Sequence, residues 1–358
     1  MDKIKIRQIC FIYAALMPAT RMLLYPATLA YHAGSGLIFS ALGNFLAEGV
    51  VIFAVMMLSK YTKCTFFELL QNTFGKLCAR IVYGLFALFF ALSSILPLLE
   101  QKGFVTQVLY ENAPTILSFA PFFAVGLFAC TKGFKSIGRI ADVALPVFAI
   151  CYAALMLLAA PQADFANLLP LGGGGGAAPV VRGWIYGLAR YTDCLFPLFF
   201  LGHFDYEKGG TAKVMIAFAA GAAATLLFLA VFYAIFADIA MMQQNAVAQI
   251  SKYTTAYTSL GRIDLLFIIA LSLVLVFSLC IPLQMCTHCA RTAFGCKPLI
   301  PAIAVNVVLL VLAAVLNYSF REVQTVFAEY MWIAFAVICY AVPLAALLLR
   351  RKPRESKK

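Results

Sequence analysis

The chain has 358 residues and a net charge of +12, and 64% of its residues are hydrophobic while only 12% are charged. A soluble domain is about half apolar and about a quarter charged, so this chain has too few polar side chains to cover a water-exposed surface. The composition excludes a soluble enzyme, a disordered chain and a nucleic-acid-binding protein. Apolar runs of about 20 residues predict an all-α integral membrane protein of the lipid bilayer rather than a barrel.

Ten apolar segments follow one another along the chain, and most are close to the length that crosses a bilayer. No soluble segment of domain size separates them, so residues 1–358 are predicted to form one transmembrane domain with a basic tail at 350–358. The polar stretch 238–262 carries spaced apolar residues, which predicts an amphipathic helix on the bundle or at the membrane interface. The ten predicted spans are 9–32, 37–58, 81–99, 113–130, 143–160, 180–201, 214–236, 265–286, 299–316 and 326–349.

Basic residues are distributed unevenly between the predicted loops. With the N-terminus placed on the inner side, twenty lysines and arginines lie in the inner segments and five in the outer ones. Basic residues accumulate on the cytoplasmic side of membrane proteins, and a missed span would destroy this alternation. The asymmetry predicts an even number of spans with both termini in the cytoplasm. The five outer basic residues are Lys102, Arg182, Lys252, Arg262 and Arg321.

Proline and charge interrupt the first and the sixth predicted span. Pro18 and Arg21 lie near the centre of the first, and Arg190, Asp193 and Pro197 lie near the centre of the sixth. Broken helices at corresponding positions of two halves are typical of inverted-repeat transporters, whose binding site lies near the bilayer midplane. Since ten spans divide into two halves of five, the pattern predicts a 5+5 inverted repeat with helices 1 and 6 broken. The two repeats are expected at about 9–160 and about 180–349.

Several short segments along the chain form a recognisable series. They are Lys3-Ile4-Lys5-Ile6-Arg7-Gln8, Thr20-Arg21-Met22-Leu23-Leu24-Tyr25-Pro26, Asn167-Leu168-Leu169-Pro170, Gly261-Arg262-Ile263-Asp264 and the pair Tyr340 and Pro343. Together they resemble the spore germination permease family, the B subunits of nutrient germinant receptors. That family belongs to the amino acid–polyamine–organocation superfamily, whose members share a LeuT-like fold. The resemblance implies a protein of the spore inner membrane that binds a small germinant, commonly an amino acid, beside an A and a C receptor subunit, without a cofactor.

The two expected breaks supply the candidate ligand-binding residues. Charges at membrane depth are costly and are functional hypotheses by default. Arg21 fits a ligand carboxylate or an ion pair within the bundle. Arg190 and Asp193 are three residues apart and would face each other on an intact helix, whereas an unwound helix would let Asp193 meet a ligand ammonium or a proton. The candidate ligand-binding residues are Pro18, Ala19, Thr20, Arg21, Tyr191, Thr192 and Asp193.

Three glutamates are candidates for proton or ion coupling. Glu48 lies in the second span, Glu100 lies at the outer end of the third, where it could reach interfacial water, and Glu329 lies early in the tenth. Each could pair with Arg21 or carry a proton, and a structural role is favoured for Glu48. The coupling ion stays open, because the serines of the eighth span, Ser272 and Ser278, are too far apart in sequence for one helical turn.

A cluster of thiols and one imidazole lies near the inner end of the eighth span. Four such side chains within eleven residues could bind zinc, but their spacing matches no standard zinc motif. Packing within the helix end is therefore the favoured interpretation, and no metal site is predicted. The residues are Cys286, His288, Cys289 and Cys296.

The leading functional hypothesis is a germinant-receptor B subunit that senses a nutrient, with an amino acid as the expected ligand. The alternative is a proton-coupled amino acid permease, since one scaffold serves both activities. A subunit with a purely structural role in assembly is the third hypothesis. No serine–histidine–acid pattern or metalloprotease signature occurs, so an enzyme is not expected.

Overall fold

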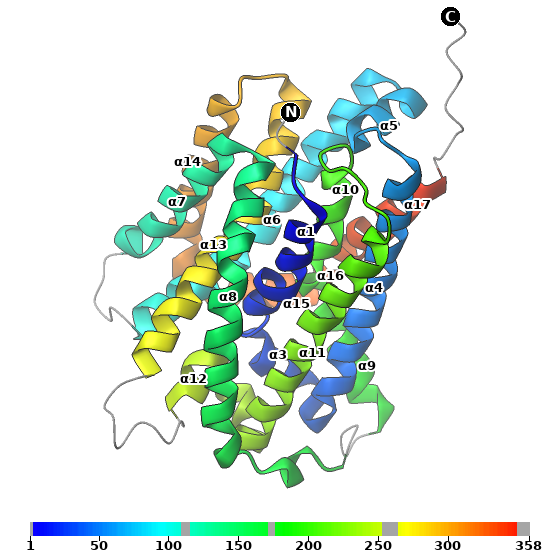
Figure 1. Ribbon diagram of the computed structural model, residues 1–358. Helices are drawn as coiled ribbons and strands as arrows, with labels where there is room; N and C mark the ends of the chain where they lie inside the picture. The colour runs from blue at the N-terminus through cyan, green and yellow to red at the C-terminus, as the bar shows by residue number, and fades with distance from the viewer. Residues whose placement is uncertain (1–2, 109–114, 171–175, 253–263, 349–358) are drawn as a thin grey trace, which may run out of the picture.

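The structure is a computed structural model that describes residues 3–108, 115–170, 176–252 and 264–348. Within these ranges every regular element is helical and no strand occurs. The helices lie side by side in an elongated bundle (Figure 1). The first half contains α1 (Ile6–Phe11), η1 (Ile12–Leu16), α2 (Met17–Thr20), α3 (Tyr25–Ala33), α4 (Leu37–Tyr61), α5 (Phe66–Phe74), α6 (Lys76–Val108), α7 (Thr115–Lys132) and α8 (Phe134–Ala159).

The second half begins with two short helices rather than one long one. It contains α9 (Ala177–Gly187), η5 (Leu188–Arg190), η6 (Thr192–Leu195), α10 (Phe196–Phe200), α11 (Gly210–Phe236), η7 (Ala237–Met242), α12 (Ala246–Lys252), α13 (Asp264–Phe294), α14 (Leu299–Leu316), η9 (Asn317–Ser319), α15 (Phe320–Glu329), α16 (Trp332–Ala336), η10 (Val337–Ala341) and α17 (Val342–Leu348). The short connections are η2 (Gly34–Gly36), η3 (Ala160–Gln162) and η4 (Phe165–Leu168).

Helix length and composition identify the membrane-spanning part of the described chain. Six helices are long and apolar enough to cross a bilayer, and three shorter apolar helices accompany them. The molecule is therefore an integral membrane protein, while the exact number of ten spans stays a prediction. The six are Tyr25–Tyr61, Lys76–Gly103, Phe134–Gln162, Gly210–Met242, Ile269–Phe294 and Leu299–Phe327, and the shorter three are Ile6–Thr20, Ser118–Lys132 and Trp332–Leu347.

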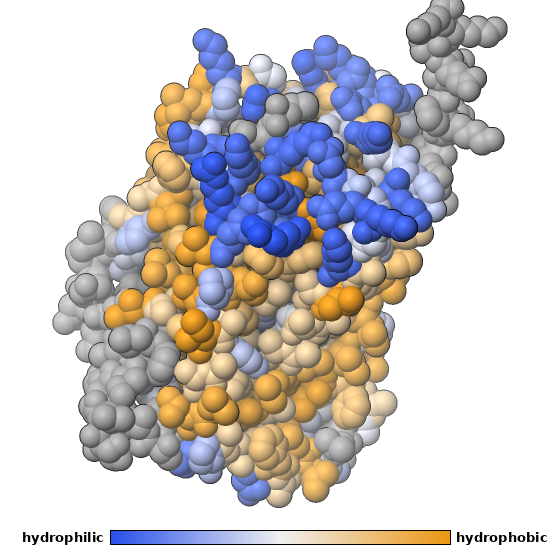
Figure 2. All heavy atoms as spheres, viewed as in Figure 1, coloured by the Kyte–Doolittle hydropathy of each residue, from blue (hydrophilic) through white to orange (hydrophobic). Residues whose placement is uncertain are grey.

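The two ends of the bundle differ in polarity. Figure 1 places the start of α1, α5 and the end of α17 toward one end, and α3, α9 and α12 toward the other. On the face drawn in Figure 2, hydrophilic residues gather over the first end, and a broad hydrophobic surface lies below them. A hydrophobic band of this kind is what lipid tails contact. The end that carries α1 and α5 is called the α1 end below.

Prolines explain where the first helix is interrupted. Pro18 was expected to break it, but the chain stays helical through Pro18, behind a π-helical turn at Ile12–Leu16. The break follows at 21–24, and α3 then begins with Pro26 in its first turn. A proline lacks the N–H of an internal helix position and clashes with the carbonyl four residues earlier, which here belongs to Met22. Pro26 therefore cannot donate a hydrogen bond back across the break, and its place in the first turn of α3 is one that suits proline.

Two further expectations about element positions need correction. The tenth predicted span, 326–349, begins inside the separate helix α15, and the last apolar helix starts only at Trp332. Glu329 is consequently exposed at the end of α15 rather than placed within a span. The predicted amphipathic helix at 238–262 is represented by η7 and α12, with 253–262 outside the described residues. α12 lies on the bundle, since Val247, Ala248 and Ile250 are buried.

Candidate functional site

The two broken helices meet at their interruptions. In the second half, α9 ends at Gly187, and Tyr191 has a non-helical backbone with φ −107° and ψ 49°. The Tyr13 hydroxyl donates to the backbone carbonyl of Asp193 at 3.1 Å, and the hydroxyls of Tyr25 and Tyr191 are 3.0 Å apart. Residues on both sides of the first break, at 21–24, thus contact the second break, at 188–195. The prediction that helices 1 and 6 are broken is confirmed.

Arg21 forms the centre of a buried ion cluster. Its Nη2 atom lies 2.9 Å from Glu48 Oε1 and 3.1 Å from Asp193 Oδ2. The guanidinium group also lies 3.9 Å from the centre of the Tyr191 ring and 5.0 Å from that of Phe45. The Arg21 side chain is 2% exposed and the Glu48 side chain 0%. An arginine with two carboxylates and two aromatic faces is the ion-paired arrangement that makes a charge at this depth tolerable.

A second ion pair lies beside this cluster. Arg190 Nη1 pairs with Glu100 Oε1, and the Glu100 side chain is 1% exposed. The predicted pairing of Arg190 with Asp193 is therefore wrong, because the chain leaves the helical path at Tyr191 and the two side chains no longer share one helix face. The expectation that Glu100 reaches interfacial water is also wrong, since Glu100 is buried and lines a cavity together with Leu24 of the first break.

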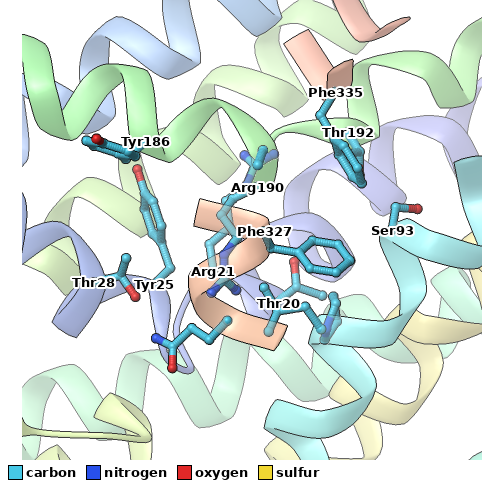
Figure 3. A pocket seen from close by; sticks show the side chains of 14 residues that line it. Thr20, Arg21, Tyr25, Thr28, Ser93, Tyr186, Arg190, Thr192, Phe327 and Phe335 are labelled. Atoms are coloured by element: carbon cyan, nitrogen blue, oxygen red, sulfur yellow. The ribbon is translucent and has the colours of Figure 1, made fainter. Parts of the chain in front are cut away.

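A cavity of about 60 Å³ opens beside both breaks (Figure 3). Its walls come from α2, α3, α6, α9, η5, η6, α15 and α16. The polar residues that line it are Thr20, Arg21, Tyr25, Thr28, Ser93, Tyr186, Arg190, Thr192 and Gln324. The apolar residues are Leu96, Pro97, Ala189, Phe327 and Phe335. This space, called the break cavity below, combines two arginines and several hydroxyls with five apolar residues.

The structure brings only part of the predicted ligand-binding set to the break cavity. Thr20, Arg21 and Thr192 line it. Pro18 and Ala19 are buried within α2, while Tyr191 and Asp193 contact Arg21 and stand outside the residues that line the cavity. Their direct contact with a ligand stays a prediction.

The candidate ligand-binding residues named from the sequence include none from α6, α9 or α15, although the ligand was expected between spans one, three, six, eight and ten. Ser93 lies one turn before Pro97 in α6, and this proximity of a hydroxyl to a helix-distorting proline was an available signal. Gln324 and Phe327 were hidden, because the separate helix α15 was merged with the tenth span.

Close packing places α9 against α4. A Cβ atom at Gly183 would lie 2.7 Å from Ser40 Oγ, and one at Gly187 would lie 2.3 Å from Asn44 Nδ2. Both distances are shorter than van der Waals contact allows, so a larger residue at either position would force Ser40, Asn44 or the helices to move. This approach holds η5 and η6, which follow α9, beside Glu48 of α4.

The thiol and imidazole cluster near the α1 end packs within the protein. Cys286 and Cys289 are buried in α13, whereas Cys296 is exposed. The His288 ring lies 4.8 Å from Phe134 and 5.3 Å from His203, measured between ring centres. Among the residues that the structure describes, no group of three histidine, cysteine or acidic side chains is arranged to hold a metal ion.

Comparisons with known proteins agree with this geometry. Residues 3–342 match the family described as "Spore germination protein". The chain belongs to that family. It is 26% identical over 184 residues to the spore germination protein YndE of Bacillus subtilis (strain 168), and the match covers 51% of this chain and 50% of YndE. The chain thus spans about half the length of that relative.

The similarity of this chain to two solved transporters shows that it has a LeuT-like fold. Mhp1, a nucleobase–cation symporter-1 transporter in a closed conformation with bromovinylhydantoin bound, superposes with a TM-score of 0.59 at 14% identity, over 97% of this chain and 91% of Mhp1. MhsT in complex with L-phenylalanine superposes with a TM-score of 0.65 at 12% identity, over 95% of this chain and 97% of MhsT. The expected fold class is confirmed, and the repeat boundaries at 9–160 and 180–349 stay a prediction.

Proposed function

We propose that this protein is the B subunit of a germinant receptor and binds a small carboxylate-bearing nutrient, most simply an amino acid, in the break cavity. The single observation that carries the proposal is that both helix breaks contribute to one cavity lined by two arginines, Arg21 and Arg190. Guanidinium groups are the preferred protein partners of carboxylates. The hydroxyls around them can bind further polar groups, and Phe327 and Phe335 offer an apolar surface to a side chain.

Arg21 retains donors that the protein itself does not use. Both of its ion pairs involve Nη2, whereas Nε and Nη1 are buried without a hydrogen-bond partner among the described residues. An unpaired buried donor is unfavourable, and a ligand carboxylate that reached these atoms would relieve that cost. The two aromatic faces beside the guanidinium offset only part of it.

Ligand binding in this position would act on several helices at once. The break cavity is bounded by the first break, the second break and α15, which are far apart in the sequence. A ligand shifts a conformational equilibrium only by binding one arrangement better than another. A nutrient that contacts all three elements would favour the arrangement in which they are close together. We infer that this preference is passed to receptor A and C subunits.

The same proposal includes a membrane orientation. Hydrophilic residues gather over the α1 end in Figure 2. The sequence assigns a set of basic residues to the inner side, among them Lys3, Lys60 and Lys132. By the positive-inside rule this end faces the cytoplasm of the spore, so that both termini lie there and the protein lies in the spore inner membrane. The opposite end, with α3, α9 and α12, would face the incoming nutrient.

The proposal is tested in spores whose own copy of this chain is replaced by variants. Thr192→Val keeps the side-chain size but removes a hydroxyl from the cavity wall, and Thr325→Val makes the same change on the exposed surface of α15. Loss of one hydrogen bond to a charged ligand corresponds to roughly a ten-fold weaker affinity. We expect Thr192→Val to raise the half-maximal germinant concentration by about that factor and Thr325→Val to leave it unchanged. An unchanged value for Thr192→Val, with normal protein levels in the membrane, contradicts the proposal.

A proton-coupled amino acid permease is the second candidate, and the buried charges favour it. The two ion clusters contain three carboxylates, Glu48, Glu100 and Asp193, but only two arginines. A net negative charge at this depth is costly, and one proton would balance it. Uptake of labelled amino acids into proteoliposomes that contain this chain alone tests the idea. A permease would accumulate substrate under an inward proton gradient, and Glu48→Gln would abolish the dependence on that gradient.

A further inference from the structure

A second cavity lies on the other side of the Arg190–Glu100 ion pair. Its volume is about 280 Å³, and it is bounded by the first break, the end of α6, the segment between η7 and α12, and the start of α15. Arg190 lines the break cavity and Glu100 lines this second cavity. The ion pair between them therefore forms the partition between two spaces.

The lining of the second cavity has a definite chemical character. It offers one carboxylate, one ammonium group, three side-chain amides and an aromatic ring: Glu100, Lys102, Gln244, Asn245, Asn317 and Phe320. Opposite charges on two neighbouring side chains complement a ligand that carries both signs, and amides bind either of its charged groups. A purely cationic ligand would be repelled by Lys102, and a purely anionic one by Glu100.

Main-chain contacts connect this lining to the first break. The backbone N–H of Ala246 donates to the carbonyl of Leu23 at 2.9 Å, which places the residues just before α12 beside the break. Leu24, the next residue, lines the second cavity together with Glu100. Because Glu100 pairs with Arg190, which lines the break cavity, a change at Glu100 would reach both cavities.

We propose that the second cavity binds a small zwitterion, such as a free amino acid, whose ammonium group competes with Arg190 for the carboxylate of Glu100. Binding there releases the Arg190 guanidinium toward the break cavity. The two sites are then coupled, and by linkage each ligand increases the affinity for the other. Binding of a zwitterion in the second cavity does not depend on the proposed function. The stronger binding of a carboxylate in the break cavity rests on that proposed function.

A cysteine reporter in the second cavity tests the proposal without reference to germination. The exposed cysteines Cys64, Cys78 and Cys296 are changed to serine, and Asn317→Cys is introduced into the full chain in lipid nanodiscs. The rate of maleimide labelling is then measured against increasing concentrations of the common protein amino acids. We expect amino acids to slow the labelling, and ethylamine or acetate, which carry one charge each, to have little effect.

Two charge variants distinguish an ion pair in which Arg190 competes with the ligand for Glu100 from an ion pair with only a structural role. Arg190→Gln removes the competitor, so the half-protecting concentration should fall about five-fold or more, within the range of typical coupling between sites. Glu100→Gln removes the ammonium partner and should raise that concentration by about ten-fold or more. Glu207→Gln, an equivalent change in an exposed ion pair, should leave it unchanged.

The outcomes separate cleanly. A structural role alone predicts that Arg190→Gln and Glu100→Gln both weaken or abolish protection, which would overturn the coupling. Unchanged labelling with every amino acid would overturn the site itself. If Arg190→Gln does not fold, two other variants replace it. Arg190→Lys should show partial protection, and the double variant Arg190→Gln with Glu100→Gln should show none. Thr192→Val separates this proposal from the proposed function. If its germination response changes while amino acids still protect the cysteine reporter from labelling, the second cavity binds its ligand independently of the break cavity.

Discussion

Arg21 joins three helices through one guanidinium group. Glu48 comes from α4 and Asp193 from the second break, and both contact the same Nη2 atom. A buried ion pair is a weak source of stability by itself, because both charges lose their hydration. Removal of one partner is different, because it leaves a charge buried without compensation. The cluster therefore fixes how α4 and the two breaks sit together more than it adds to total stability.

Replacement of Glu48 should be severe. Glu48→Leu leaves Arg21 with Asp193 alone, and the loss of a buried ionic partner costs about 3–5 kcal/mol. The matched change Glu207→Leu affects an exposed pair with Lys213 and should cost at most about 1 kcal/mol. Unfolding free energies of the purified chain in mixed micelles measure both values. Equal, small losses for the two variants would show that the Arg21 cluster does not depend on Glu48.

His203 should make stability depend on pH. It lies after α10, half-buried against Phe134 and His288, and this burial lowers its pKa. The unfolded chain then binds a proton more readily than the folded chain. The stabilisation is complete above about pH 6.5 and is lost as the pH falls toward the pKa of the folded state. Melting temperatures between about pH 7.5 and 5.5 should fall for the wild type and fall less for His203→Phe.

At the scale of helices, the sequence located charges more reliably than their partners. Arg21, Arg190 and Asp193 were recognisable because charge is rare at membrane depth. Their pairing depends on the relative positions of helices that are far apart in sequence, and a single chain carries no direct signal for that. The local rule that residues three apart face each other failed at Arg190 because it presumes an intact helix.

The breaks were predictable in number but less so in position. An interruption of the first span was predicted correctly, but it was attributed to Pro18, which is accommodated in α2. The break lies at 21–24, and Pro26 stands in the first turn of α3. A π-helical turn precedes Pro18, and another precedes Pro343. Such turns contain an extra residue that changes the local hydrogen bonding, so a proline can follow without ending the helix. A hydropathy pattern does not report them.

The contact between α9 and α4 gives a prediction about glycine. Gly187→Ala would place a methyl group 2.3 Å from Asn44 Nδ2, so the buried Asn44 side chain has to move, and overpacking of this kind costs typically about 1–3 kcal/mol. Gly84→Ala is a matched change within α6, where nothing lies within 4 Å of the new methyl group. It should be neutral or stabilising by up to about 1 kcal/mol. Thermal unfolding of both variants tests the difference, and equal behaviour would mean that the close approach is not required.

At the scale of the whole molecule, composition and charge were sufficient to predict a helical membrane bundle, while the LeuT-like fold was expected from the interrupted spans and the family resemblance. An apolar chain with alternating loop charge has few alternatives to a helical membrane bundle, and the superposition on two transporters confirms the LeuT-like fold. Cavities were not predictable in the same way, because they arise where side chains from several helices fail to fill space. Only Thr20, Arg21 and Thr192 of the predicted ligand-binding set line the break cavity.

Native cysteines can test the orientation of the molecule. The exposed cysteines Cys64, Cys78 and Cys296 all lie in segments assigned to the cytoplasm. A membrane-impermeant thiol reagent should not label them in intact protoplasts and should label them after permeabilisation. Phe165→Cys, at an exposed position of η4 in an outer segment, is the positive control and should react in intact protoplasts. Labelling of the native cysteines from outside would reverse the assigned orientation.

The hydrogen bond from Ala246 to Leu23 has a consequence for how this molecule responds to mutation. Both atoms belong to the main chain, so exchanging either side chain leaves the bond in place. An alanine scan would pass over this link between an outer segment and the centre of the protein. Deletions or insertions near Ala246, or proline at that position, are the changes that would remove the hydrogen bond. Natural variation in the length of the 237–245 stretch is accordingly a route by which related proteins could retune their responses without altering a single binding residue.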